Sequence, residues 1–391
     1  MKILNINKYY YIKGGAERYY FALADLLKEK GHQVIPFSQK HADNFATPYS
    51  KYFPEMKYRF FWSFATAKKL EELIIKEKPD IAHVHLIYHH LTPSVLSVLQ
   101  KHKIPVVLTM HDYKLICPNY LLYTKGQNCE RCKKHKYYNA VFHKCVYSTY
   151  SASLVVSMEM YFHKIFQLYE KNINTIIAPS RFAEKKLIEF GLPRKKIKCI
   201  PHFIDLKNRK PAYEPGDYLL YFGRLSKEKG IDKVLEALYN SRLKIKLKIA
   251  GSGPYLPDLQ LIVNKYKLQE QVEFLGHLDT EKLAKVVQQS KLVIVPSLVW
   301  ETFGLAALEA FAYGKTVLTS GQGALSEVVT KNTGIIYQDN LSEELKNIWN
   351  KEEKIILLGK NARQFVEKNY SKEQHYEKIM SVYRDLLPAS A

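Results

Sequence analysis

The chain alternates short apolar runs with amphipathic stretches along most of its length. Apolar runs that predict buried strands occur in the first half of the chain at residues 2–7, 33–37, 80–85, 105–109 and 175–180. The same pattern returns in the second half at residues 218–222, 246–250, 272–276 and 291–296. Strands that alternate with helices predict parallel, doubly wound sheets. The expected fold class is therefore α/β, with ligand-binding residues just beyond the carboxyl ends of the strands.

The length of 391 residues exceeds that of one ordinary core and predicts two domains. We expect an N-terminal Rossmann-like domain over residues 1–206 and a second over 218–370. The segment 207–217 is rich in proline and charge and has no periodicity, which is typical of a linker. A last helix is expected within residues 371–391. No spanning helix and no signal peptide are recognisable, which predicts a cytoplasmic protein.

The net charge of +21 is distributed unevenly. Residues 1–205 hold 32 Lys and Arg against 16 Asp and Glu, whereas the remainder holds 27 against 22. A lysine-rich composition alone would raise both halves alike, so the difference indicates a polyanionic partner for the first half: nucleic acid, an acidic glycan or an anionic membrane surface. Residues 51–78 interleave aromatic and basic side chains, a mixture that suits a membrane interface, nucleic acid or a core-facing helix.

Residues 291–314 hold the most informative pattern. An apolar strand ends at Pro296-Ser297, Glu301 follows, and a small-residue helix begins at Gly304 and contains Glu309. The free N–H groups and the dipole of a helix N-terminus favour an anion. Two carboxylates around an anion site suit a ligand that has both hydroxyl and phosphate groups.

Three further strand ends are followed by residues that could contact such a ligand. Arg224 and Lys229 follow the strand at 218–222, a glycine turn containing Gly251 follows 246–250, and His111 follows 105–109. Near the N-terminus, Gly14-Gly15 separates a strand from a helix. Paired glycines let the backbone approach a phosphate or sugar closely, although a purely structural turn is the more common explanation of such a pair. Histidines 83, 85, 89 and 90 are interpreted as packing residues.

Together these motifs resemble the retaining nucleotide-sugar glycosyltransferases of group 1, also called glycosyltransferase family 4. The resemblance covers almost the whole chain except an insert at 112–150. It implies the GT-B fold, in which two Rossmann-like domains face each other across a cleft and the last helix, here within 371–391, crosses back to the first domain. It also implies a nucleotide-sugar donor held mainly by the second domain and an acceptor held by the first. One departure is Pro201-His202, where the family often has an asparagine after the proline.

The resemblance assigns the site residues. It implies catalytic roles for His111, Glu301, Arg224 and Lys229. The donor-binding set would be Gly14, Gly15, Arg224, Lys229, Gly251, Leu275, Glu301, Phe303, Gly304, Leu305 and Glu309. The two cations would neutralise the leaving diphosphate, Glu301 would bind the donor sugar, and Glu309 would bind the ribose. Because no Asp-x-Asp motif occurs, no catalytic metal is expected.

The expected reaction is retaining transfer of a hexosyl or N-acetylhexosaminyl group, with UDP preferred over GDP as the donor nucleotide. The acceptor would be a glycan or lipid-linked acceptor in bacterial capsule, lipopolysaccharide or exopolysaccharide synthesis. The protein would contact the inner face of an anionic cell membrane peripherally and would not bind nucleic acid.

Four of the five cysteines lie close together, with the spacing C-x11-C-x2-C-x12-C: Cys117, Cys129, Cys132 and Cys145. In a cytoplasmic protein this clustering favours structural Zn²⁺ over disulfides. Free thiols or an iron–sulfur cluster remain alternatives.

Two other functions compete with the transferase. A GT-B-fold sugar-nucleotide epimerase would share the architecture, but the Arg224, Lys229, Glu301 and Glu309 set argues against it. A non-catalytic basic binding protein would explain the charge. It lacks support because no helix-turn-helix, zinc-finger spacing or RNA-binding aromatic motif is present.

Overall fold

The computed structural model describes residues 1–39, 61–338 and 340–387. The chain divides into two compact units. The first unit contains residues 1–125, 129–201 and 375–391, and the second contains 126–128 and 202–374. The sequence places the corresponding domain limits at 206, 218 and 371. No helix of the described residues is long and apolar enough to cross a membrane.

The first unit is built on a six-stranded sheet of order β2-β1-β3-β4-β7-β8 in which every strand pair is parallel. Its strands are β1 (Lys2–Tyr9), β2 (Gln33–Gln39), β3 (Ile81–Val84), β4 (Val106–Thr109), β7 (Thr175–Ala178) and β8 (Ile197–Cys199). In the register of β1 with its two neighbours, Ile3 pairs with Val34 of β2 on one side and with Ile81 of β3 on the other. The parallel sheet expected from the apolar runs is confirmed.

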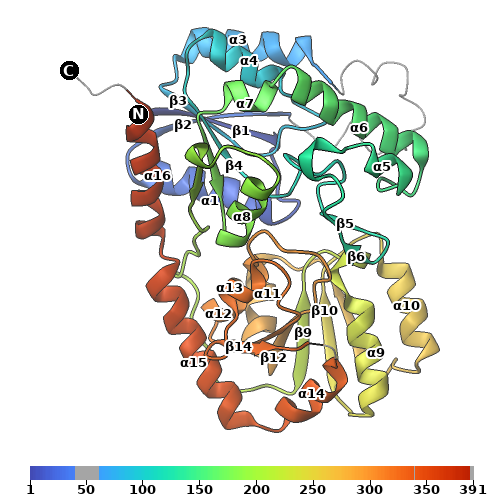
Figure 1. Ribbon diagram of the computed structural model, residues 1–391. Coiled ribbons are helices and arrows are strands. Elements are labelled where there is room, and N and C mark those ends of the chain that lie inside the picture. Colours follow the sequence, from blue (N-terminus) through green and yellow to red (C-terminus); the bar gives the residue numbers. More distant parts are fainter. Residues whose placement is uncertain (40–60, 339, 388–391) are drawn as a thin grey trace. The chain divides into compact units, whose positions relative to one another are not determined.

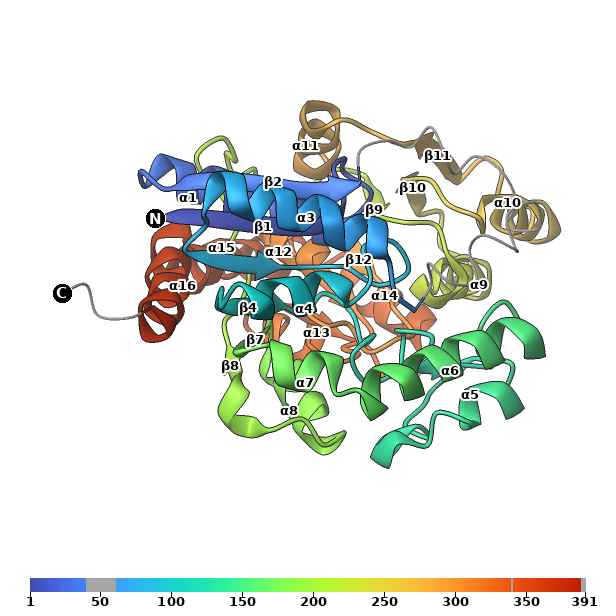
Figure 2. The same ribbon diagram turned by 90° about the horizontal axis from the view of Figure 1, so that it is seen from above.

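Helices cover both faces of this sheet. They are α1 (Gly15–Glu29), α3 (Phe64–Glu77), α4 (Ser94–Lys101), α6 (Tyr150–Ile165), α7 (Leu168–Asn172), α8 (Arg181–Glu189) and α16 (Lys372–Leu386). Figures 1 and 2 show α1 on one face and the row α3, α4 and α7 on the other. Because both faces are covered, the strands are buried almost throughout, which explains their continuous apolar runs.

The Cys-rich insert is only partly regular. It contains the short strands β5 (Tyr123–Thr124) and β6 (Gln127–Asn128), a 3₁₀ turn at Lys133–His135 and the single-turn helix α5 (Asn139–Phe142).

One predicted helix differs from the observed structure. The sequence pattern of residues 155–170 predicts a single helix there, whereas α6 already begins at Tyr150 and ends at Ile165, and α7 follows it. The early start has a local cause, because the Thr149 side chain accepts a hydrogen bond from Ala152 N and caps the helix. The break occurs at Gln167, whose φ of 52° is left-handed and cannot continue a right-handed helix.

The last helix, α16, begins in the second unit and belongs to the first unit from His375 onward. Three of its side chains form hydrogen bonds there. The Tyr383 hydroxyl lies 2.5 Å from His83 Nδ1, His375 Nε2 lies 2.9 Å from the Tyr19 hydroxyl, and the Tyr376 hydroxyl lies 2.9 Å from His32 Nε2. These contacts fix the C-terminal helix to the first unit.

The second unit repeats the architecture with a parallel sheet of order β11-β10-β9-β12-β13-β14. The strands are β9 (Tyr218–Phe222), β10 (Lys246–Ala250), β11 (Val272–Gly276), β12 (Leu292–Val295), β13 (Val317–Thr319) and β14 (Gly334–Ile336). The helices are α9 (Ile231–Ser241), α10 (Leu256–Lys265), α11 (Thr280–Gln288), α12 (Leu305–Ala312), α13 (Leu325–Val328), α14 (Leu341–Trp349) and α15 (Glu352–Asn369). The sequence did not single out β14, α14 or α15.

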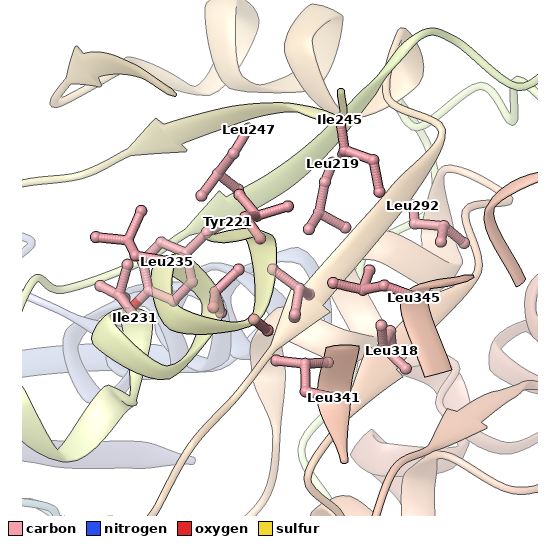
Figure 3. Close-up of a cluster of buried hydrophobic side chains, with 14 of the residues drawn as sticks. Leu219, Tyr221, Ile231, Leu235, Ile245, Leu247, Leu292, Leu318, Leu341 and Leu345 are labelled. Carbon is pink, nitrogen blue, oxygen red and sulfur yellow. The ribbon is translucent and has the colours of Figure 1, made fainter. Parts of the chain in front are cut away.

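The central strand β9 is buried from both sides. Leu219 and Tyr221 belong to a hydrophobic cluster with α9, α10 and α14, part of which is drawn in Figure 3. Leu220 and Phe222 belong to a second cluster with α12, α13 and α15. Alternate side chains of one strand point to opposite faces. The two clusters therefore hold β9 and the loop that follows it in a fixed position.

Candidate functional site

The loop between β9 and α9 presents two cations at the carboxyl end of the central strand. Arg224 is exposed, and its side chain forms no ion pair with any residue that the structure describes. Lys229 ends a 3₁₀ turn, and Gly230 in the left-handed conformation (φ 71°) caps α9 directly after it. A Cβ on Gly230 would lie 2.2 Å from the carbonyl oxygen of Pro296. This glycine therefore lets the Lys229 loop pack against the loop after β12.

Glu301 lies in the loop after β12 and accepts hydrogen bonds from both loops, the one after β9 and its own. Lys229 Nζ and Ser297 Oγ each lie 2.6 Å from Glu301 Oε1. Burial raises the pKa of the Glu301 carboxyl, but the ion pair with Lys229 and the hydrogen bond from Ser297 outweigh burial and hold the pKa below its ordinary value of 4.5. Glu301 is therefore a carboxylate at neutral pH, joined to a cation of the neighbouring loop.

The loop after β10 runs directly against the Arg224 loop. Leu225 N donates to Ser252 O at 3.0 Å, and Gly223 N donates to Ala250 O at 3.0 Å. A Cβ on Gly251 would lie 1.8 Å from Gly223 O, so only glycine fits at this point. The predicted donor residue Gly251 thus supports the position of Arg224, and its own N–H donates to Gly276 O beside the predicted residue Leu275.

The helix α12 begins at Gly304, whose φ of 98° is left-handed. Leu305 is its first residue, and the first N–H groups of a helix have no partner within it. Glu309 lies one turn further along and is largely buried. Phe303 is 4% exposed and packs edge-on against His202, with ring centroids 4.8 Å apart. Its side chain therefore anchors the loop, which leaves main-chain groups as its means of contact with a ligand.

The structure brings one segment of the Cys-rich insert to this loop. Asn128, which groups with the second unit, accepts a hydrogen bond from Trp300 N through Oδ1 at 3.2 Å. Its Nδ2 donates to Gln322 Oε1 at 3.1 Å. Trp300 directly precedes Glu301, and Glu301 forms an isolated parallel bridge with Gly323. Asn128 therefore holds the two chain segments beside Glu301, a role that the sequence did not indicate.

In the first unit, His111 ends a chain of buried polar side chains. His111 Nε2 lies 2.9 Å from His85 Nδ1, and His85 Nε2 lies 3.0 Å from Asn5 Oδ1. Because the Asn5 oxygen accepts, His85 carries its proton on Nε2 and accepts through Nδ1, so His111 donates through Nε2. Burial lowers the pKa of His111 to about 3, which keeps the ring neutral at pH 7.

The interpretation of His83 and His85 as packing residues missed this connection. The rings of His83 and His85 are stacked, with centroids 4.7 Å apart and an interplanar angle of 4°. His83 is also hydrogen-bonded to Thr109 and Tyr383. His85 contacts His111 directly and so positions a predicted site residue. The signal was present in the sequence as His-x-His at a strand end, but spacing alone does not show which partner each ring reaches.

A second missed group lies at the ends of β1, β3 and β4. Lys8 is largely buried, with Nζ 3.7 Å above the Tyr88 ring, and the Tyr88 hydroxyl donates to Asp112 Oδ2 at 2.5 Å. Burial lowers the pKa of Lys8 to about 8, although the charges of Asp112 and Glu17 oppose the shift. The predicted Gly14 and Gly15 lie at the start of α1, where Gly14 is an extended N-cap without a side-chain cap.

The four clustered cysteines are free and line one small hollow in the insert. Burial raises the pKa of Cys117 to about 12 and also raises the pKa of Cys132 and Cys145. Within residues 1–39, 61–338 and 340–387, no three His, Cys, Asp or Glu side chains are arranged so that they could hold a metal ion. The zinc site therefore stays a prediction.

The basic aromatic segment at 51–78 is only partly described. Its residues 51–60 lie outside the described residues. Of the remainder, Phe64 is 80% exposed at the start of α3, Lys68 and Lys69 are exposed, and Phe61 and Trp62 are half-buried.

The two parallel-sheet units have the fold of the GT-B type. Sucrose-phosphate synthase of Thermosynechococcus elongatus superposes with a TM-score of 0.74 at 20% identity, covering 98% of each chain. The Anabaena protein HepE, solved with UDP and glucose, superposes with a TM-score of 0.69 at 17% identity, covering 98% of this chain and 99% of that one. At these identities the two likenesses establish the fold.

The chain belongs to the group 1 glycosyltransferases. The model of the family "Glycosyl transferases group 1" matches residues 203–374, and that of "Glycosyltransferase Family 4" matches residues 13–208. An uncharacterized glycosyltransferase of Methanocaldococcus jannaschii is 23% identical over 99% of both chains. An uncharacterized 42.6 kDa protein in the cps region of Klebsiella pneumoniae is 26% identical over 88% of this chain and 91% of that one. The predicted family and fold class are confirmed.

Proposed function

We propose that the protein transfers a sugar from a nucleoside diphosphate donor, a UDP-sugar in preference to a GDP-sugar, to a glycan or lipid-linked acceptor without a catalytic metal ion. The observation that carries the proposal is the contact of Lys229 with Glu301 at 2.6 Å, with the unpaired Arg224 on the same loop as Lys229. A cation and a carboxylate held together at strand ends suit a ligand with a diphosphate and sugar hydroxyls.

Arg224 and Lys229 would stabilise the leaving diphosphate. Negative charge develops on the diphosphate as the glycosidic bond breaks, and preorganised donors at such a position contribute about 3–4 kcal/mol each. Gly251 and Gly253 hold the loop in place, since a Cβ on Gly253 would lie 2.1 Å from Leu225 O. With two cations fixed in this way, the loop offers the charge that a Mg²⁺ ion supplies elsewhere.

The loop before α12 would bind the sugar. Glu301 would accept hydrogen bonds from the hydroxyls of the transferred sugar, while the N–H groups of Gly304 and Leu305 would face its oxygens at the helix start. Glu309 would accept hydrogen bonds from the hydroxyls of the ribose. The Anabaena protein solved with UDP and glucose, which shares the fold, supports a nucleotide-sugar as the ligand class.

In the first unit, Gly14 and Gly15 would let the start of α1 approach the donor's phosphate. Neutral His111 would serve as a hydrogen-bonding group for the donor sugar and not as a general acid, because its pKa is far below neutral. We further propose that the reaction retains the anomeric configuration through front-face attack and that the sugar is a hexose or N-acetylhexosamine.

The relative encoded in a cps region supports a role in capsule or other surface polysaccharide synthesis. Such acceptors are commonly lipid-linked. We therefore propose peripheral contact with the inner face of an anionic membrane and no binding of nucleic acid.

Nucleoside diphosphate release tests the proposal directly. We expect the protein to release UDP from at least one of UDP-glucose, UDP-galactose and UDP-N-acetylglucosamine, with a rate that EDTA does not change. Glu301→Gln should lower that rate about 100-fold or more, since it removes a charged contact to the reacting sugar. The matched control Glu273→Gln changes an exposed glutamate on β11 and should leave the rate within about twofold.

Other results would contradict the proposal. Loss of UDP release in EDTA that added Mg²⁺ or Mn²⁺ restores would show that the reaction needs a metal ion. Conversion of the UDP-sugar to its epimer with the diphosphate intact would instead establish the sugar-nucleotide epimerase.

We also propose that the four cysteines of the insert bind a structural Zn²⁺, which would draw together thiols that the described structure does not place in a metal-holding arrangement. The chemistry of the donor set supports this, because four free thiols line a single hollow and thiolates are the preferred ligands of structural zinc. The ion would take no part in sugar transfer and would fix the insert.

A further inference from the structure

The outer face of α6 carries apolar side chains that no helix or strand of the described residues covers. Tyr150, Leu154, Met158 and Ile165 are between 49% and 72% exposed. Their spacing places them along one stripe of the helix. The opposite side of α6 is buried, with Ser153, Val156 and Met160 packed into the first unit. The helix is therefore anchored by one face and leaves an apolar face to solvent.

The neighbouring helix extends this surface. α5 packs against α6, and Figures 1 and 2 both show the two helices side by side. Tyr138, Phe142, Tyr147 and Phe166 are 46–74% exposed around this pair. Eight of the eighteen exposed large apolar side chains of the described residues thus fall within residues 138–166. We call these eight residues the α5–α6 apolar face.

The charge around the face has one sign. Residues 131–158 contain five Lys or Arg and no Asp or Glu. The one acid within 131–169 is Glu159, which is fully buried and bound to Lys114 at 2.6 Å. The exposed cations of residues 125–144 are Lys125, Arg131, Lys134, Lys136 and Lys144. None of the five forms an ion pair with a residue that the structure describes. Glu130, the one acid in that range, pairs with Lys133 and Lys186.

The cations and rings also lie next to each other. Lys144 Nζ lies 4.3 Å above the ring of Tyr150, so a positive charge lies directly beside an exposed aromatic side chain. Rings at the acyl boundary with cations at the phosphate level are the arrangement of an interfacial membrane-binding surface.

We propose that the α5–α6 apolar face docks onto an anionic lipid bilayer, with Phe142, Leu154 and Ile165 entering the headgroup and acyl boundary. The inference deepens the membrane contact of the proposed function and rests on it, but it assigns that contact to a surface other than residues 51–78. The described part of residues 51–78 contacts this helix pair where the rings of Phe61 and Phe162 lie 5.7 Å apart.

A protein partner suits the face less well than a bilayer. The core of a protein interface is depleted in charge, and lysine in particular is disfavoured there. Here lysines that form no ion pair with a described residue surround the apolar residues, and residues 131–169 hold no exposed acid that could pair with a partner's cations. A surface rich in phosphate groups complements both features.

Vesicle co-sedimentation tests the inference. The full chain should bind phosphatidylcholine vesicles that contain phosphatidylglycerol, should bind pure phosphatidylcholine vesicles weakly, and should lose affinity as salt rises. The double variant Leu154→Glu/Ile165→Glu should reduce partitioning roughly tenfold or more, because it replaces inserted apolar groups by charge. Lys134→Glu/Lys136→Glu should reduce binding to the anionic vesicles alone.

Matched controls lie in the second unit. Leu261→Glu changes a 67% exposed leucine on α10, and Lys354→Glu changes an exposed lysine on α15. Both should bind vesicles as the unaltered protein does. Equal binding by all variants, or no binding of the unaltered protein, would overturn the inference. A dimer that dissociates in the Leu154→Glu/Ile165→Glu variant without lipid would also overturn it, in favour of a protein interface.

Failure of this inference can be separated from failure of the proposed function. UDP release from UDP-glucose, measured in solution without vesicles, should be the same in the unaltered protein and in the α5–α6 variants. Vesicle binding without UDP release would leave the surface intact as a membrane anchor and would count against the transferase proposal instead.

Discussion

At the scale of single residues, the contact between Lys229 and Glu301 decides the state of the candidate site. Burial alone would favour a protonated Glu301, yet the ion pair and the Ser297 hydroxyl hold the pKa of the carboxyl below 4.5. A carboxyl with a lowered folded-state pKa stabilises the fold at pH values above its unfolded pKa. That stabilisation is lost as the pH falls through the folded pKa.

The lowered pKa of Glu301 predicts how the effect of Lys229→Gln depends on pH. The variant leaves Glu301 buried without its cation, so it should lower the free energy of unfolding by about 1 kcal/mol at pH 7, a value reduced by partial exposure of the pair. The loss should shrink below pH 4.5, where the unaltered protein also loses the benefit of the pair. Urea unfolding at pH 7 and pH 4 measures both values.

Lys227→Gln is the matched control, because Lys227 is exposed on the same 3₁₀ turn and forms no ion pair with a described residue. It should change the free energy of unfolding little at either pH. An equal loss from both variants, or a loss from Lys229→Gln that does not depend on pH, would show that the pair does not control Glu301.

At the scale of elements, the sequence predicted most strands well and helix ends less well. Strands such as β9 and β12 are buried on both faces, so their apolar runs stand out. The start of α6 depended on the Thr149 cap, and its end depended on one left-handed residue, Gln167. Neither appears in a hydrophobic period. The exposed apolar face of α6 was missed for another reason: exposed and buried apolar residues look alike in a sequence.

The site divides in a similar way. The sequence could indicate Arg224, Lys229 and Glu301 as candidate ligand-binding residues. Each follows the end of a predicted strand, and ligands of parallel α/β sheets bind beyond the carboxyl ends of the strands. Asn128 could not be predicted, since its partners Trp300 and Gln322 are far away in the sequence. Lys8 was also missed, because its charge is sequestered by tertiary contacts with Tyr88.

The Cys-rich insert yields a prediction about metal content. If zinc fixes this element, the purified protein should contain one Zn²⁺ per chain by elemental analysis, and Cys132→Ser should remove it and lower the thermal unfolding temperature. Cys199→Ser, on β8 outside the insert, should retain the metal. A folded, active protein free of zinc and iron would leave the cysteines as buried thiols.

At the scale of the whole molecule, the two units share one architecture. Each unit is a parallel sheet with residues of chemical interest at its strand ends, but the candidate residues differ. Those of the second unit are cations and carboxylates, and those of the first include the histidine chain that ends at His111. The excess of positive charge in the first half is consistent with a surface for an anionic partner, and the exposed lysines around α5 and α6 account for part of it.

The central claim is that Arg224 and Lys229 hold the diphosphate of a nucleotide-sugar. Isothermal titration of UDP, GDP and ADP into the unaltered protein, Arg224→Ala and Lys227→Ala tests it most directly. We predict that one nucleotide binds, UDP being the first choice, and that Arg224→Ala weakens its binding about 10–100-fold through loss of charge-assisted hydrogen bonds. Lys227→Ala should bind within about threefold of the unaltered protein. Unchanged binding in Arg224→Ala, or no binding of any of the three nucleotides, would contradict the account.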